Sequence, residues 1–434
     1  MFKQITILFL VLSFGYIYSQ WSERVSGVTV QLTSVSAIDN NNTWVCGYSG
    51  TVLRTTNQGF NWMNVSGNGI PSTIQLINVW GIDANTALVA GYIGSDTWVY
   101  RTSNAGANWT QVFTETGGFI NGLVIRLDGS GFMTGDPVGG RWSLWKTNNN
   151  GVTWDSTGLY LVQSGSETGY NNCVSVAIKR IWFGTNNSRI YYSSNNGANW
   201  SIQTASPETQ ITAIWFDMNG SATGYCGGNN IHKTTNYGAN WVSIGGPGTG
   251  LILGVAGLTM WGGNLWYVRS GSSVIYFGYG EGTWFSQHTA PAGTYRHVTT
   301  DRIPNQPFLG YAVRTNGGIS FTQIFVQGIK NLGGEIPESF SLSQNFPNPF
   351  NPNTKIRFAV TSLDNGLQPI VQLKLFDVLG REVATLVNEQ LQPGTYEAEF
   401  DGIDFPSGVY YYTLEADPET SSGFREMKKM VLIK

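Results

Sequence analysis

Charge is scarce in this chain of 434 residues. Asp, Glu, Lys and Arg make up 12% of it, and the formal net charge is −3. Globular proteins usually reach a charged share of about 25%. Disordered chains combine high charge with low hydrophobicity, and nucleic-acid-binding proteins need a basic surface that meets phosphate. The composition therefore disfavours both classes, and we expect no nucleic-acid partner.

Cysteine and histidine are nearly missing, with three residues of each. Cys46, Cys173 and Cys226 allow at most one disulfide, so they cannot form a disulfide framework. The His residues have no spacing to these Cys that is typical of a zinc site. We expect neither a metal nor another cofactor, and we expect Cys46 and Cys226 to be small buried core residues.

Long apolar runs are also missing, apart from one near the N-terminus. This run extends from Ile5 to about Ile17 and is followed by Ser19 and Gln20. It is shorter than the roughly 20 apolar residues that a membrane-spanning helix needs. Together with the preceding Lys3, it is typical of a secretory signal peptide. We expect residues 1–20 to direct Sec export and to be cleaved near Ser19 or Gln20, which leaves no integral membrane span.

Turn-forming and aromatic residues are abundant instead. The chain contains 55 Gly and 16 Trp. Short alternating apolar runs stand between turn residues, and runs with the 3.6-residue period of an amphipathic helix do not occur. These patterns predict an all-β fold.

One motif, [ST]xNxGxxW, recurs five times between residues 55 and 241, with steps of 47, 45, 46 and 41 residues between its Gly positions. Such a period is typical of a four-stranded β-propeller blade. A degenerate copy with Gly282 and Trp284, and a copy at 314–321 with Asn316 and Gly318, bring the expected number of blades to seven. The segment from Trp21 resembles the last strand of a repeat, so we expect it to close the ring. The complete copies hold Asn57, Gly59 and Trp62; Asn104, Gly106 and Trp109; Asn149, Gly151 and Trp154; Asn195, Gly197 and Trp200; and Asn236, Gly238 and Trp241.

This repeat resembles the Asp-box, or bacterial neuraminidase repeat, of sialidase-like and photosystem II assembly factor-like propellers. The family consensus is SxDxGxxW, and Asn stands here in place of Asp. The resemblance implies a structural role. The polar side chain would bind backbone N–H groups of a tight turn, the Gly would supply a positive φ and the Trp would pack into the blade. Because Asn is uncharged, we expect no catalytic or calcium role for these positions.

A second module follows near residue 330. All Trp residues lie before this point, whereas residues 331–434 hold 8 Lys and Arg against 14 Asp and Glu. Short alternating strands joined by Pro and Gly turns predict a small β-sandwich with an immunoglobulin-like fold. The expected boundaries are a signal peptide at 1–20, a seven-bladed propeller at 21–330, a linker at 331–337 and the sandwich at 338–434.

The second module closely resembles the type A C-terminal sorting domain of the type IX secretion system of Bacteroidetes. The strings NFPNPFNP (345–352), FDVLGREV (376–383), SGVYYY (407–412) and KKMVLIK (428–434) carry the resemblance. It implies export across the outer membrane, a secreted or cell-surface location and the secretion translocon as a partner. Under this interpretation Lys428, Lys429 and Lys434 belong to the sorting signal; otherwise they are merely solvated.

Function in such propellers resides on the face opposite the box turns, where loops enter the first strand and join the second to the third. The loop at 157–172 and the insertion at 134–142 are expected to form a pocket there. The candidate ligand-binding residues on this face are Tyr92, Asp96, Asp136, Arg141, Glu167, Tyr170, Arg189 and Arg296. Asp136 precedes a Pro, so it is alternatively a turn residue.

Folding or export explains every strong motif, which favours a non-catalytic binding or scaffold protein for a protein or polysaccharide partner. The first alternative is an extracellular glycoside hydrolase, sialidase-like or xyloglucanase-like. It would need Arg141, Arg189 and Arg296 around a Tyr and a Glu, or a close pair of carboxylates. The string RIP at 302–304 follows the boxes rather than preceding them, so we set it aside. The second alternative is an assembly factor for another exported protein.

Overall fold

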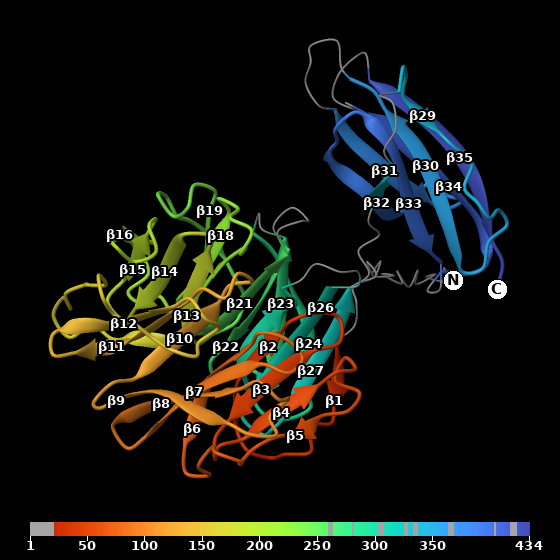
Figure 1. Ribbon diagram of the computed structural model, residues 1–434. Helices are drawn as coiled ribbons and strands as arrows, with labels where there is room; N and C mark the ends of the chain where they lie inside the picture. Colours follow the sequence, from red (N-terminus) through yellow and green to blue (C-terminus); the bar gives the residue numbers. More distant parts are fainter. Residues whose placement is uncertain are drawn as a thin grey trace, which may run out of the picture. The chain divides into compact units, whose positions relative to one another are not determined.

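The computed structural model describes residues 21–258, 264–279, 282–302, 308–324, 329–332, 337–362, 369–402, 405–416 and 423–434. The chain divides into a unit at Ser19–Ile324 and another that includes Phe325–Lys434 (Figure 1). Every regular element within these ranges is a β-strand, which confirms the all-β prediction. The signal peptide expected at residues 1–20 lies outside the described residues.

Seven antiparallel sheets follow one another in the first unit, and we call them blades 1 to 7. Strands are numbered along the chain, and the first strand of each blade is the inner one. The blades are β2–β5 (Leu32–Ala37, Thr43–Gly47, Val52–Thr55, Met63–Asn64), β6–β9 (Gln75–Gly81, Ala87–Ile93, Asp96–Thr102, Thr110–Glu115), β10–β12 (Ile120–Ile125, Gly131–Val138, Arg141–Thr147), β13–β16 (Gly169–Ala177, Arg180–Thr185, Arg189–Ser193, Ser201–Thr204), β17–β20 (Ala213–Phe216, Gly224–Gly227, Ile231–Thr234, Val242–Gly245), β21–β24 (Ile252–Leu258, Asn264–Arg269, Val274–Tyr279, Thr283–Thr289) and β25–β27 (Tyr295–Thr300, Phe308–Arg314, Ile319–Ile324) with β1 (Ser22–Arg24).

The inner strands form a closed ring. Each contacts the inner strand of the next blade, and β25 contacts β2. Because each inner strand lies between two neighbouring blades, β2 and β10 are buried along their whole length. Each fully buried Leu, Ile or Val contributes about 1.5–3 kcal/mol to folding.

The N-terminal strand completes the last blade. Strand β1 pairs with β27 so that Ser22 lies opposite Phe321, which confirms the ring closure expected from the sequence. The Glu23 carboxylate accepts hydrogen bonds from Ser320 Oγ at 2.8 Å and His288 Nε2 at 2.9 Å, and it pairs with Arg314. A group of side chains from both ends of the propeller therefore fixes the seam.

The five complete boxes form one type of turn between the third and fourth strand positions. Thr55 Oγ1 accepts hydrogen bonds from the N–H groups of Asn57 at 3.3 Å and Gly59 at 3.0 Å, and Asn57 Oδ1 accepts one from Asn61 at 3.0 Å. The other four complete boxes repeat this pattern. The Gly has a positive φ in all five, as expected. The residue before it also has a φ of 56–62°, which the sequence analysis did not foresee.

The copy expected at residues 314–321 is not a box. Residues 315–318 join β26 to β27, which are the second and third strands of blade 7. The positive φ falls on Gly317, not on Gly318, whose N–H donates to Asn316 Oδ1 at 3.3 Å. The prediction for Asn316 and Gly318 is therefore wrong. The fourth strand of this blade comes from the other end of the chain, so no turn joins it to the third.

Blade 3 departs from the four-stranded pattern. Its sheet has three strands, and the fourth position holds a segment attached by the isolated bridges Lys146↔Asp155 and Arg141↔Val162. The extra residues after Trp154 move away from β12 between these bridges and return at Val162. The loop predicted at 157–172 thus replaces a regular outer strand.

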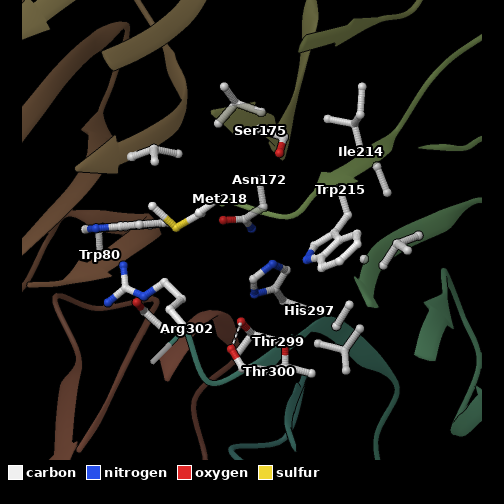
Figure 2. A pocket seen from close by; sticks show the side chains of 18 of the residues that line it. Trp80, Asn172, Ser175, Ile214, Trp215, Met218, His297, Thr299, Thr300 and Arg302 are labelled. Atoms are coloured by element: carbon white, nitrogen blue, oxygen red, sulfur yellow. Dashed lines mark hydrogen bonds between the residues drawn. The ribbon is translucent and has the colours of Figure 1, made fainter. Parts of the chain in front are cut away.

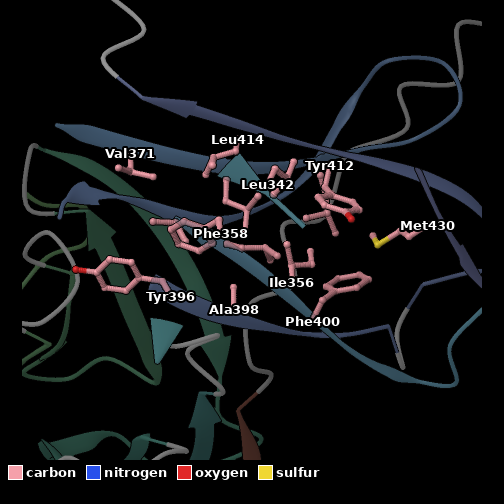
Figure 3. Packing of buried hydrophobic residues seen from close by; sticks show 14 of the residues in the cluster. Leu342, Ile356, Phe358, Val371, Tyr396, Ala398, Phe400, Tyr412, Leu414 and Met430 are labelled. Carbon is pink, nitrogen blue, oxygen red and sulfur yellow. The ribbon is translucent and has the colours of Figure 1, made fainter. Parts of the chain in front are cut away.

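The second unit contains two four-stranded sheets. They share one apolar core, whose packed side chains are drawn in Figure 3. Residues 329–331, which the sequence placed at the end of the propeller and the start of the linker, pair with β33 of this sandwich. They form the edge strand of one of its sheets. The strands are β28 (Ile329–Asn331), β29 (Ser341–Leu342), β30 (Asn353–Val360), β31 (Ile370–Phe376), β32 (Glu382–Gln390), β33 (Gly394–Asp401), β34 (Gly408–Ala416) and β35 (Phe424–Leu432).

The Pro-rich string of this unit has a buried amide at its start. Asn345 is 2% exposed; its N–H donates to Tyr412 Oη at 2.8 Å, and its Nδ2 donates to Thr354 Oγ1 at 2.9 Å. Replacing Asn345 with Ala is expected to destabilise the sandwich by about 1–3 kcal/mol, because Thr354 loses a buried partner. Hydrogen exchange of β30 and β34 in the full chain measures this. The exposed Asn351→Ala is the control, and equal exchange in both variants would contradict the prediction.

Candidate functional site

A central cavity of about 180 Å³ lies inside the ring of inner strands, and residues of all seven blades line it (Figure 2). The lining combines aliphatic and polar side chains in similar numbers, and Trp80, Trp215, Phe216 and Met218 are its large apolar side chains. This is the composition of a small-molecule or side-chain pocket, in which a few polar groups fix orientation.

One part of the cavity lining carries neutral hydrogen-bonding groups. His297 Nδ1 accepts a hydrogen bond from the backbone N–H of Val35 at 3.2 Å, and burial lowers the pKa of His297 to about 4. The imidazole is therefore neutral at physiological pH and carries its proton on Nε2. Asn172 accepts a hydrogen bond from Ser34 Oγ at 2.9 Å. These groups can orient a polar ligand without contributing charge.

Another part carries charge. The Arg302 guanidinium lies 4.0 Å from the centre of the Trp80 ring and bonds to the carbonyl of Gly81, and burial lowers its pKa to about 9. Asp301 Oδ1 accepts a hydrogen bond from Leu309 N–H at 3.0 Å, whereas its buried Oδ2 has no hydrogen-bond partner among the residues that the structure describes. Burial raises the pKa of Asp301 to about 7. A carboxyl group with this pKa can exchange a proton near neutrality.

The eight candidate residues named from the sequence do not line this cavity. Most cavity residues come from inner strands, whose sequences resemble those of ordinary buried strands, so no local signal separates them from the core. Asp301 and Arg302 directly follow the inner strand of blade 7. The RIP string was the one available signal, because it contains Arg302. We set it aside on its order along the chain.

Two of the acidic candidates hold neighbouring segments together. Asp136 Oδ1 accepts hydrogen bonds from Asn121 Nδ2 at 2.6 Å and Gly169 N–H at 2.7 Å. Burial raises the pKa of Asp136, although these two hydrogen bonds act to lower it. It thereby links blade 3 to blade 4. Asp96 Oδ1 accepts a hydrogen bond from Gly117 N–H at 3.1 Å. Both carboxylates thus have structural partners.

The third acidic candidate, Glu167, is buried and lies in a cluster with a second candidate, Arg189. It pairs with Arg189 at 2.9 Å and accepts a hydrogen bond from Tyr191 Oη at 2.7 Å. The same arrangement recurs 41 residues later in blade 5, where Glu208 contacts His232 at 3.3 Å. Since two adjacent blades repeat this acid at one position, stabilising the blade accounts for it without catalysis.

The remaining candidates lie on four different blades. The Tyr92 ring packs 5.1 Å from Phe119, and the hydroxyl of Tyr170 bonds to Gln210. Arg141 is exposed at the start of β12, and Arg296 is half-buried in β25 of blade 7. The structure therefore brings Arg189 to a Tyr and a Glu, but it does not bring Arg141, Arg189 and Arg296 together.

A groove of about 500 Å³ lies between residues 160–164 and the β15–β16 hairpin. Its rim exposes Tyr160 at 64%, Val162 at 54% and Ile202 at 55% of their surfaces. Arg189 also lines it, together with Ala198, Asn199 and Trp200 of the blade 4 box. The groove therefore differs from the expected pocket, because no residue of the insertion at 134–142 lines it and box residues do.

All three Cys are buried and unpaired. Burial raises the pKa of Cys46 and Cys173 to about 12, so neither thiol ionises near neutrality. The expectation of buried core residues at Cys46 and Cys226 is confirmed.

Comparison with known families separates the two units. Residues 18–146 match the family described as photosynthesis system II assembly factor YCF48. Residues 344–431 match the secretion system C-terminal sorting domain. The chain joins a propeller similar to this assembly factor to a secretion sorting domain. The sorting domain supports secretion or a place on the outer cell surface, and it implies engagement with the type IX secretion machinery. The described residues contain no helix long and apolar enough to cross a membrane.

Solved structures confirm the propeller fold. YCF48 from Cyanidioschyzon merolae has a TM-score of 0.54 at 15% identity, over 70% of this chain and 99% of that one. A structure of YCF48 bound to D1 peptide has the same score and identity, over 70% and 97%. The Niastella koreensis GH74 enzyme has a TM-score of 0.52 at 12% identity, over 94% and 67%. Such identities show the fold alone. No curated protein matches the chain.

The three Lys residues assigned to the sorting signal lie on or just after β35. Lys428 pairs with Glu426 at 3.0 Å, and Lys429 is exposed. The backbone N–H of Lys434 donates to Ser407 Oγ at 3.0 Å. Their part in sorting remains a prediction.

Proposed function

We propose that this protein is exported through the type IX secretion system and acts outside the cell as a non-catalytic binding or scaffold protein. The observation that carries the proposal is the state of Asp96, Asp136 and Glu167. Each carboxylate accepts hydrogen bonds from its own or a neighbouring blade. Acids used in this way hold loops in place, and the face they support is available for a ligand.

A glycan array tests the proposal. The purified full chain is applied to immobilised glycans or to protein partners, and released sugar is measured in the same wells. We expect retention without release. Release of sugar from any glycan would contradict a non-catalytic role.

A glycoside hydrolase is the second candidate, and the central cavity supports it. Asp301 and Asp217 both line this cavity, and a pKa of about 7 suits Asp301 to donate a proton to a leaving group. If this candidate holds, Asp301→Asn lowers sugar release by at least about 100-fold. Equal release by Asp301→Asn and the unmodified chain would exclude Asp301 as the acid.

An assembly role for another exported protein is the third candidate, supported by the groove beside Tyr160, Val162 and Ile202. Clustered exposed apolar side chains from two blades are typical of a protein contact. If the groove binds a partner protein, that protein cross-links to the unmodified chain and does not cross-link to the Val162→Asp variant. Val242→Asp, on the equally exposed outer strand of blade 5, retains it.

A further inference from the structure

Three consecutive blades place a polar-tipped side chain at one equivalent position. Tyr48 directly follows Gly47 at the end of β3, and Tyr92 follows Gly91 in β7, 44 residues later. Asp136 follows Gly135 in β11 after another 44 residues. The position lies where the second strand of each blade turns toward the third, on the face opposite the box turns.

Aromatic side chains gather at this position. The Tyr92 ring centre lies 5.1 Å from that of Phe119, which precedes the inner strand of blade 3, and burial together with the nearby Tyr48 of blade 1 raises the pKa of Tyr92. All three side chains are half-buried rather than enclosed. We call Tyr48, Tyr92 and Phe119 the aromatic row. The row is therefore a partly exposed aromatic surface to which blades 1, 2 and 3 each contribute one ring.

Hydrogen-bonding groups continue the aromatic row along the ring. Asp136 bonds to Asn121, and Tyr170 of blade 4 bonds to Gln210. None of these residues is a Lys or Arg, and burial raises the pKa of Asp136. A surface of this kind offers ring faces to C–H groups, and amides and hydroxyls to hydroxyls, without an excess of either charge.

We propose that the aromatic row is the binding site for a neutral polysaccharide. This inference rests on the proposed binding function and names its ligand class. A polymer of repeated sugar units fits a surface whose binding groups recur from blade to blade. Stacking on the rings supplies affinity, and the polar side chains fix orientation.

Affinity electrophoresis of the full chain tests this inference. Native gels contain a soluble β-glucan, a xyloglucan, a galactomannan or, for contrast, the anionic polymer alginate. We expect retardation by at least one neutral polysaccharide and none by alginate. Tyr92→Ala and Phe119→Ala should each weaken retardation by about tenfold, the equivalent of one stacking contact. Tyr92→Phe should retain most of it, because it keeps the aromatic ring. Unchanged urea unfolding of both Ala variants would exclude misfolding as the cause.

Tyr160→Ala is the matched control, because Tyr160 is 64% exposed in the groove of blades 3 and 4. Unchanged retardation of both Ala variants would contradict the aromatic row as the binding site. The proposed binding function would then require a site elsewhere on the chain. Failure of every neutral polysaccharide to retard the chain would also overturn it, and the function would then require a protein partner. Retardation together with sugar release would overturn the non-catalytic role but not the row.

Discussion

Replacement of Glu23 with Ala is expected to destabilise the propeller by about 2–4 kcal/mol, since it removes a partner from a buried cation. The Arg314 side chain is 4% exposed, and Glu23 is its ion-pair partner across the seam between β1 and β27. Removal of Glu23 leaves this guanidinium desolvated and uncompensated. It also removes the acceptor for Ser320.

Urea unfolding followed by tryptophan fluorescence measures this effect, because every Trp of the chain lies in the propeller. Val25→Ala is the control, since Val25 follows the same strand and is 88% exposed. We expect the control to change the unfolding free energy by less than about 0.5 kcal/mol. A similarly small change for Glu23→Ala would show that the seam does not depend on this ion pair.

Asp301→Asn is expected to stabilise the propeller at pH 8 by about 2–4 kcal/mol and to leave it nearly unchanged at pH 4. The pKa of Asp301 is raised from 3.8 in a free carboxyl to about 7 by burial. The folded state therefore holds a proton that the unfolded state releases. Stability falls as the pH rises from about 4 to about 7, and the penalty is fully present above that range. Asn removes the ionisable group and keeps an oxygen that can accept from Leu309.

Thermal unfolding between pH 4 and pH 8 measures this difference. Asp128→Asn is the opposite control, because hydrogen bonds from Ser130 lower the pKa of Asp128. The stability that the ionised Asp128 contributes is therefore lost as the pH falls. Parallel pH curves for Asp301→Asn and the unmodified chain would mean that Asp301 ionises in the folded state as readily as in water.

Repetition made much of the fold predictable. The box motif specifies a turn through local contacts between its own Ser or Thr, Asn and Gly, so five copies gave the period and the turn chemistry directly. The strand at Trp21 also resembled a repeat end, and it does pair with β27. The sorting domain was recognisable because its Pro-rich string and its last strand are distinctive segments.

The wrong prediction relied on the spacing between repeats and not on contacts within the motif. Asn316 and Gly318 lie two periods after the preceding box, but Gly317 bears the positive φ and the turn joins a different pair of strands. The candidate site was also incomplete. Glu167, Arg189 and Tyr191 meet across a loop and a hairpin, and Arg302 reaches Gly81 from a distant part of the chain. The first contact depends on how one blade folds and the second on ring closure, and a motif of a few consecutive residues predicts neither.

The pairing of Ser22 with Phe321 has a consequence for biosynthesis. A chain that emerges from its N-terminal end presents β1 first, but the partner of β1 is the last propeller strand to appear. Until that strand arrives, the blades can form only an open arc whose terminal faces expose apolar side chains. A nascent or translocating chain is therefore open to association through these faces until β27 appears. A tag fused directly before Trp21 would sit at the one joint that closes last.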